Sequence, residues 1–191
     1  LETFYRQLDA LQKGDILVLA GSIPTVLPST IYRDIMKRLQ KREVMIVVDA
    51  TKNLLVNVLE YHPFLIKPNN YELGEIFGVT LSTKEDVILY AKKLQEMGAA
   101  NVLVSMAGDG AVLVAEDGST YKSEAPEGKV KNSVGAGDSM VAGFLYGYLK
   151  SGIYEDAFYY GVCTGSASAF SENLATREEV DTLLMNIKNR A

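Results

Sequence analysis

The sequence predicts an α/β protein with a mostly parallel sheet, and two features of its hydrophobic pattern carry that prediction. Short apolar runs without polar alternation are separated by amphipathic helical segments, which is typical of parallel strands covered by helices on both faces. Glu116-Asp117-Gly118 lies between two extended stretches and signals an antiparallel hairpin at one edge of the sheet. We therefore expect a single α/β domain over residues 1–191.

The first half of the chain alternates helices with strands. Phe4, Leu8 and Leu11 recur at the spacing of one helix face, and this first helix leads into an apolar run. Short apolar runs indicate buried strands, and apolar residues one helical turn apart indicate helices. In order, the predicted elements are a strand at 15–20, a helix at 29–40, a strand at 44–48, a helix at 52–60, a strand at 64–66 and a short helix at 72–77.

Residues typical of helix starts and ends indicate the element boundaries in the rest of the chain. Ser82 and Glu85 have the spacing of a capping box, and Gly98 ends the helix that follows them. Thr176 and Glu179 form a second predicted capping box. The remaining predicted elements are strands at 101–105, 111–115 and 119–123, and helices at 138–150, 155–171 and 176–189.

Charge and composition exclude several classes of function. Lys and Arg number 19 against 24 Asp and Glu, and the net charge of −5 gives no general attraction to nucleic-acid phosphates. No apolar run approaches the ~18 residues of a membrane span. Cys163 is the only cysteine and cannot form an internal disulfide. We therefore expect a cytoplasmic protein without nucleic-acid or membrane partners.

The first residues predict that the chain is part of a longer protein. The sequence begins at Leu1 rather than at a Met, and a helical pattern is already present at Phe4. An amphipathic element this early is typical of the middle of a domain. We therefore expect a C-terminal fragment.

A glycine-rich turn that opens into a helix is the main candidate for chemistry. Its sequence is Gly135-Ala136-Gly137-Asp138, followed by an amphipathic stretch. The first N–H groups of a helix lack intrahelical partners, so together with the helix dipole they can hold an anion such as a phosphoryl group. A carboxylate beside them can accept a proton from an attacking hydroxyl. The alternative is that Asp138 simply caps the helix.

Segment 132–144 resembles the C-terminal signature of the ribokinase-like carbohydrate kinases, the phosphofructokinase B family. That signature is Asn or Asp, two residues of any type, Gly-Ala-Gly-Asp, three further residues and then a small pair, here Ala142-Gly143. The resemblance covers essentially the entire chain and implies a ribokinase-like fold, with the family's N-terminal strands and lid absent. It implies ATP as phosphoryl donor, with Asp138 as general base. It makes Gly135, Ala136 and Gly137 the anion hole.

A second motif, Lys67-Pro68-Asn69-Asn70-Tyr71-Glu72, follows the third predicted strand. The family carries Asn-x-x-Glu there, and the resemblance assigns Asn69 and Glu72 to a network of Mg²⁺ and phosphate. Mg²⁺ prefers hard oxygen ligands, and ligands bind at strand C-termini in open α/β sheets. The alternative is a turn at Asn69 and a helix start at Glu72. Lys67 is compatible with either a phosphate contact or simple solvation.

The loop 105–111 after the fourth strand is glycine-rich and can expose N–H groups to nucleotide phosphates. The resemblance makes it part of the ATP site, although many relatives have Gly where this chain has Ala107, and a hairpin entry can be glycine-rich without binding anything. The implied ATP contacts are Ser105, Gly108, Asp109 and Gly110, with Ala167 and Asn173 on the adenine side.

The loop Gly21-Ser22-Ile23-Pro24 follows the first strand and is similar to the Gly-Ser-Leu-Pro of bacterial hexose-phosphate kinases in this family. Ser22 is therefore the candidate for sugar binding, although a turn without function is an alternative. His62 lacks a second His or Cys nearby for a metal site, and Cys163 lies among small helical residues, so both are interpreted as structural.

Within the family the motifs are most similar to bacterial kinases of fructose 1-phosphate. The resemblance implies transfer of the γ-phosphoryl group of ATP to the 6-hydroxyl, giving fructose 1,6-bisphosphate, with Mg²⁺ as cofactor and a possible homodimer in the full-length protein. Phosphorylation of tagatose 6-phosphate is an alternative. A catalytically silent nucleotide-binding fragment is another, and we expect the 191-residue chain alone to have little activity.

Overall fold

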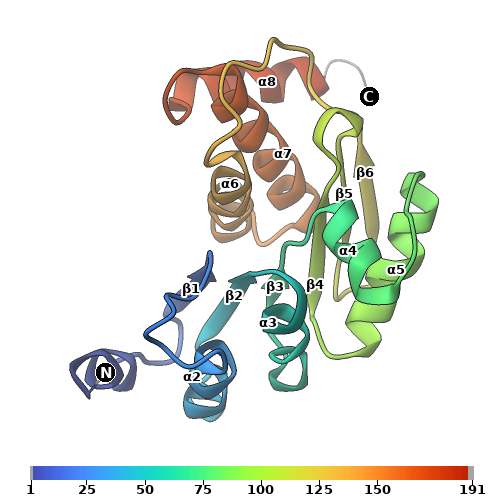
Figure 1. Cartoon of the computed structure of the whole chain (residues 1–191). Helices are drawn as coiled ribbons and strands as arrows, with labels where there is room; N and C mark the ends of the chain where they lie inside the picture. Colours follow the sequence, from blue (N-terminus) through green and yellow to red (C-terminus); the bar gives the residue numbers. More distant parts are fainter. Residues whose placement is uncertain (1, 189–191) are drawn as a thin grey trace. The chain divides into compact units, whose positions relative to one another are not determined.

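A computed structural model describes residues 2–188 of the protein (Figure 1). These residues form two compact units. The first contains the chain up to Val104 together with Val114–Gly118, and the second contains Ser105–Leu113 and the chain from Ser119 onward. The expectation of a single domain stays a prediction, and each unit is described by itself.

The elements follow the order that the hydrophobic pattern predicts (Figure 1). The chain begins with α1 (Glu2–Asp9), β1 (Ile16–Ala20), α2 (Ile31–Leu39), β2 (Met45–Asp49), α3 (Lys52–Val56), the 3-10 turn η1 (Leu59–Tyr61), β3 (Leu65–Ile66), α4 (Asn70–Phe77) and α5 (Lys84–Glu96). It continues with β4 (Asn101–Ser105), the 3-10 turn η2 (Ala107–Asp109), β5 (Ala111–Val114), β6 (Thr120–Ser123), α6 (Ala136–Ser151), α7 (Tyr154–Phe170) and α8 (Arg177–Lys188).

The strands form a six-stranded sheet in the order β1-β2-β3-β4-β5-β6. Strands β1 to β4 pair in parallel, with Val47 opposite Leu65 and Ile66 opposite Val102. Consecutive residues of β2, β3 and β4 are buried, and because neighbouring side chains in a strand point to opposite faces, both faces are covered. Neighbours β5 and β6 are joined by a tight turn at Gly118 and therefore form the expected antiparallel edge pair. The predicted fold class is confirmed.

Two predicted boundaries differ from the structure. The single helix predicted at 52–60 is α3 followed by η1, because the α-helix already ends at Val56, with Asn57 as its C-cap, and the chain continues in a tighter 3-10 turn. The capping box predicted at Ser82 and Glu85 is wrong by one position. Thr83 is the N-cap, and its Oγ1 accepts a hydrogen bond from Asp86 N–H at 3.1 Å.

Two other boundary predictions can be compared with the structure. The capping box at Thr176 and Glu179 is confirmed, because Thr176 N–H donates to Glu179 Oε2 at 2.7 Å. The end of the last helix predicted at residue 189 lies outside the described residues.

No helix within residues 2–188 combines the length and apolar character needed to span a membrane.

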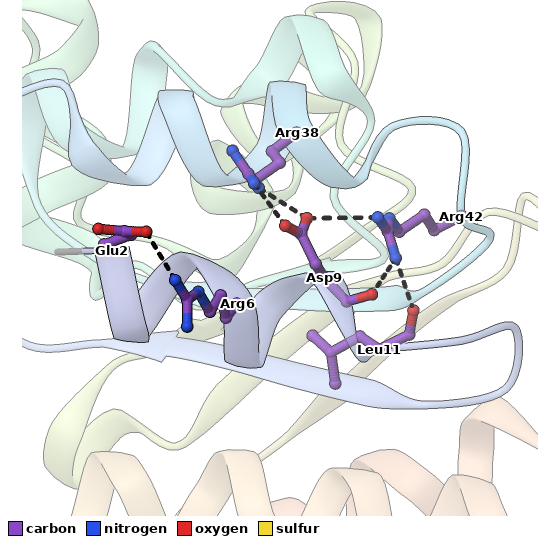
Figure 2. Close-up of polar contacts among 6 residues, drawn as sticks. All are labelled: Glu2, Arg6, Asp9, Leu11, Arg38 and Arg42. Carbon is purple, nitrogen blue, oxygen red and sulfur yellow. Dashed lines mark hydrogen bonds and ion pairs between the residues drawn. The ribbon is translucent and has the colours of Figure 1, made fainter.

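Helices α1 and α2 are joined by a cluster of charged side chains (Figure 2). Asp9 on α1 accepts hydrogen bonds from Arg38 Nε at 2.8 Å and from Arg42 at 3.2 Å. Arg42 also donates to the backbone carbonyls of Asp9 and Leu11. The bidentate contact with Arg38 and the carbonyl contacts with Arg42 fix α1 against α2.

Helices α6 and α7 of the second unit pack closely because glycines lie on their facing sides (Figure 1). A Cβ added at Gly143 on α6 would collide with Thr164 on α7. A Cβ added at Gly165 on α7 would lie 3.0 Å from the carbonyl oxygen of Ala136, the first residue of α6. The starting point of α6 is therefore set by backbone contact with α7.

Cys163 lies in the apolar core between α7 and α8, together with Ala167, Val180 and Leu184. Burial raises the pKa of the Cys163 thiol to about 12, so the reactive thiolate is suppressed near neutral pH. The structural interpretation of this cysteine is confirmed.

The Asp9 cluster predicts a pH-dependent contribution to stability. The hydrogen bonds from Arg38 hold the pKa of Asp9 below its ordinary value. Because the folded pKa is lowered, the stabilisation is present above the ordinary carboxyl pKa and is lost as the pH falls through the folded value. We expect Asp9→Asn to lower Tm modestly at about pH 7, and the Tm difference from the wild type to shrink progressively as the pH falls below the ordinary carboxyl range.

Thermal unfolding across this pH range checks the prediction. Glu2→Gln serves as the matched control, because it removes the exposed Glu2–Arg6 pair on the same helix. A Tm difference for Asp9→Asn that stays constant into acid would contradict the assignment.

Candidate active site

The glycine-rich turn before α6 leaves backbone donors without partners. Gly135 precedes the helix in the left-handed conformation, with φ at 78°, which a residue with a Cβ adopts only at a cost. Ser139 N–H closes the first turn onto Gly135 O at 2.8 Å. Within residues 2–188, no carbonyl accepts a hydrogen bond from the N–H groups of Gly137 and Asp138. These donors and the helix dipole can hold an anion.

Asp138 is the third residue of α6, and its side chain is exposed. Over the part of the chain that the structure describes, its carboxylate has no hydrogen bond or ion pair. The helix start carries no side-chain capping bond, so the capping role that the sequence left open is not seen. A carboxylate placed beside the donors of Gly137 is suited to accept a proton next to a bound anion.

The segment leading into the turn is anchored to the end of α7. The N–H groups of Lys131 and Asn132 both donate to Ala169 O, at 2.8 and 3.1 Å. Asn132 Oδ1 in turn accepts a hydrogen bond from Val134 N–H at 3.0 Å. The third expected member of the anion hole, Ala136, donates its N–H to a carbonyl of this same segment at 3.2 Å. The turn is thus held by backbone contacts before the helix begins.

In the first unit, Asn69 and Glu72 form a reciprocal capping box at the start of α4. Glu72 N–H donates to Asn69 Oδ1 at 2.8 Å, and Asn69 N–H donates to Glu72 Oε2 at 2.8 Å. The helix-start alternative is therefore realised in the structure. A capping box occupies only one oxygen of the carboxylate, so this arrangement is compatible with a metal-facing role, which stays a prediction.

A buried ion pair beside this capping box was not predicted. Lys67 Nζ lies 3.3 Å from Asp49 Oδ1, and only 6% of Lys67 is exposed. Lys67 is therefore not simply solvated. Asp49 ends the apolar strand β2, and Lys67 follows β3. An acidic residue and a basic residue at the ends of neighbouring parallel strands were the signal that could have identified the pair.

Ser22 follows β1 at the same sheet edge as Asp49, because β1 and β2 are parallel neighbours. The loop is fixed by a hydrogen bond from Gly21 N–H to Asp49 O at 3.1 Å and by one from the Tyr32 hydroxyl to Ala20 O at 2.7 Å. Burial, and then the nearby Asp49 carboxylate, raise the pKa of Tyr32, so its hydroxyl remains a donor. Ser22 itself is exposed.

The loop expected to contact ATP phosphates forms the 3-10 turn η2 in the second unit. Gly108 and Asp109 are exposed, and Ser105 at the end of β4 is partly exposed. Gly110 is buried, and its N–H already donates to Ala107 O at 3.1 Å. This arrangement favours a packing role for Gly110 and leaves its neighbours as the accessible residues.

The two expected adenine-side residues differ in accessibility. Asn173 is exposed in the loop between α7 and α8. Ala167 is only 2% exposed and packs in the core between the same helices. Its side chain therefore contributes to the packing of α7 against α8. A direct contact between Ala167 and a nucleotide stays a prediction.

The candidate residues are divided between the two units. Ser22, Asn69 and Glu72 belong to the first, whereas Asp138 and the turn before it belong to the second. The expectation that both groups face one cleft stays a prediction. Within residues 2–188, no group of three or more His, Cys, Asp or Glu side chains is arranged to hold a metal ion.

Known proteins match almost the whole chain. The sequence profile of the family described as pfkB family carbohydrate kinase matches residues 1–180. A 1-phosphofructokinase of Bacillus subtilis strain 168 is 48% identical over 187 residues, which are 98% of this chain and 61% of that protein. A D-tagatose-1-phosphate kinase of Bacillus licheniformis is 32% identical over 176 residues, which are 92% of this chain and 58% of that protein.

Solved structures give the same relationship. Phosphofructokinase-2 from Escherichia coli, in complex with substrates and products, superposes with a TM-score of 0.91 at 26% identity. The match covers 98% of this chain and 62% of that one. The chain therefore spans about three fifths of the length of the relatives it matches.

The left-handed turn generates a prediction for stability. Gly135→Ala should lower the free energy of unfolding by roughly 1 kcal/mol, because the Cβ is unfavourable at positive φ. It would also lie 3.2 Å from Leu174 Cδ2. Ala107 has a φ of 48°, so Ala107→Gly, as the reverse substitution, should not destabilise the protein. Urea unfolding measures both changes, and equal destabilisation by the two variants would contradict the conformational explanation.

Proposed function

Because the chain belongs to the pfkB family of carbohydrate kinases, we propose that it carries the catalytic and nucleotide-binding residues of a sugar-phosphate kinase. The proposed reaction transfers the γ-phosphoryl group of ATP to the 6-hydroxyl of fructose 1-phosphate. The observation that carries this proposal is the exposed carboxylate of Asp138 beside two N–H groups at the start of α6, all of which have no hydrogen-bond partner among residues 2–188. The 48% identity with a protein named 1-phosphofructokinase supports the choice of sugar phosphate.

In the proposed mechanism, Asp138 accepts the proton of the attacking hydroxyl while the turn holds the phosphoryl group. The oxygen of the sugar forms a bond to the γ-phosphorus, and the bond to the β-phosphate oxygen breaks. The N–H groups of Gly137 and Asp138 stabilise charge on the moving phosphoryl oxygens. Such a loose transition state depends on positioning and charge neutralisation more than on a strong base.

Mg²⁺ fits the chemistry of the first-unit residues. Asn69 and Glu72 offer hard oxygen atoms, which this ion prefers, and the ion commonly keeps several waters and binds substrate phosphates. When bound, Mg²⁺ neutralises charge on the transferred phosphate. We propose Asn69 and Glu72 as the residues that hold it. The neighbouring ion pair of Lys67 and Asp49 is held at the same sheet edge.

Two alternatives rest on specific observations. The 32% identity with a D-tagatose-1-phosphate kinase supports a tagatose phosphate as the acceptor. The coverage of 61% of the Bacillus subtilis relative supports the proposal that this chain is a C-terminal part with little activity by itself. A homodimer of the longer protein and a cytoplasmic location also stay proposals.

An ADP-release assay tests these possibilities. It compares the 191-residue chain with a form extended upstream to the length of the curated relatives, using fructose 1-phosphate, tagatose 6-phosphate and tagatose 1-phosphate as acceptors. We expect the extended form to favour fructose 1-phosphate. ATP with Mg²⁺ should raise the Tm of both forms, because a ligand that binds the folded state stabilises it. Nucleotide binding without turnover on any acceptor would support the silent fragment instead.

Asp138→Asn gives the sharpest test of the proposed mechanism. Removal of the base should lower kcat by roughly 10²- to 10⁴-fold in the active form, while ATP affinity changes far less. The matched control is Glu178→Gln, which removes an exposed carboxylate from the first turn of another helix. Steady-state kinetics and ATP titration provide both quantities. A loss of kcat below tenfold would remove Asp138 from the role of base.

A further inference from the structure

Two buried hydroxyl groups connect the first turn of α6 with the end of α7. Ser168 Oγ donates to Ser139 Oγ at 2.9 Å, and Ala175 N–H donates to Ser168 Oγ at 3.0 Å. Ser168 is 3% exposed and Ser139 is 8% exposed. Ser168 therefore links three separate segments: α6, α7 and the loop that leads into α8.

This link reaches the residues next to the proposed base. Ser139 follows Asp138 directly, and its N–H closes the first turn of α6 onto Gly135 O. Ala169, the neighbour of Ser168, accepts the backbone hydrogen bonds that anchor the segment before the turn. Both sides of the glycine-rich turn are thus fixed to the same point on α7.

The two buried hydroxyl groups contribute hydrogen bonds as well as packing to this interface. A polar group buried without a hydrogen bond costs about 1–3 kcal/mol, so removing Ser168 Oγ would leave the Ala175 N–H and Ser139 Oγ unsatisfied. The same α6–α7 interface is otherwise packed through glycines such as Gly143 and Gly165. Backbone contact sets the interface geometry at these glycines. Ser168 adds a directional hydrogen bond at the N-terminal end of α6, next to Asp138.

We propose that Ser168 is a positioning residue of the phosphoryl-transfer site, acting through Ser139 to hold Asp138 and the turn before it in place. The proposal rests on the proposed function. It adds that the loop at Ala175, near the exposed Asn173, is connected to the orientation of the base through one hydroxyl group.

The test uses Ser168→Ala and Ser139→Ala in the upstream-extended form. The second variant breaks the link from the α6 side and leaves the Ala175 bond in place. Thr164→Ala is the matched control, because Thr164 is on the same helix and, among the described residues, its hydroxyl donates only to Tyr160 O of that helix. kcat, KM for ATP, Tm and amide hydrogen exchange are measured for each.

Both serine variants should lower kcat by about 10- to 100-fold with a much smaller change in KM for ATP, as expected when a reacting group is displaced by ~1 Å. The kcat of the double variant should equal that of the less active single variant, because both substitutions break the same hydrogen bond. The hydrogen-bonded amides of Ala136 and Ser139 should exchange faster in Ser168→Ala without nucleotide. Thr164→Ala should lower Tm without these effects.

Unchanged kcat in the serine variants of an active enzyme, or unchanged exchange at the amides of Ala136 and Ser139, would overturn the positioning role. If the wild type shows no turnover with any acceptor, the proposed function fails by itself. The exchange measurement then still decides whether Ser168 orders the start of α6.

Discussion

The close approach of α6 to α7 is the constraint on which the candidate site depends. Gly143 allows the two backbones to come together where a Cβ would collide, and a Cβ at Gly165 would lie only 3.0 Å from the carbonyl oxygen of the first residue of α6. The start of a helix is where its unpaired N–H groups and positive dipole end are found. Fixing that start against α7 therefore fixes the direction in which the donors and the neighbouring Asp138 are presented.

Much of the fold could be predicted from the sequence because its local signals agree with one another. The buried strands lack polar alternation, the hairpin is marked by Gly118, and Thr176 and Glu179 mark the start of α8. The boundaries that were wrong involve competing local choices. Ser82 and Thr83 are both good capping residues, and the helix begins after the second. The predicted helix at 52–60 ends early because propensity alone does not register the 3-10 turn that follows Asn57.

The site was less predictable, since side-chain partners depend on contacts between segments distant in sequence. The motifs identified Asp138 and Asn69 by type and spacing, but they could not indicate that Asn69 caps a helix or that Asp138 has no side-chain partner within residues 2–188. The Lys67–Asp49 pair and the Ser139–Ser168 link were missed for the same reason. The ends of the two strands carried a signal for the ion pair, whereas a buried serine has no pattern of its own and its role becomes visible only when the helices are brought together.

In the proposed function, the N–H groups at the start of α6 receive the phosphoryl group of a nucleotide beside Asp138. Backbone amide chemical shifts, recorded as a non-hydrolysable ATP analogue and Mg²⁺ are added, measure this most directly. We expect the largest changes in amide chemical shift at Gly137 and Asp138, and smaller changes in α1 and α2. Saturable nucleotide binding that leaves the amides of Gly137 and Asp138 unshifted would contradict it.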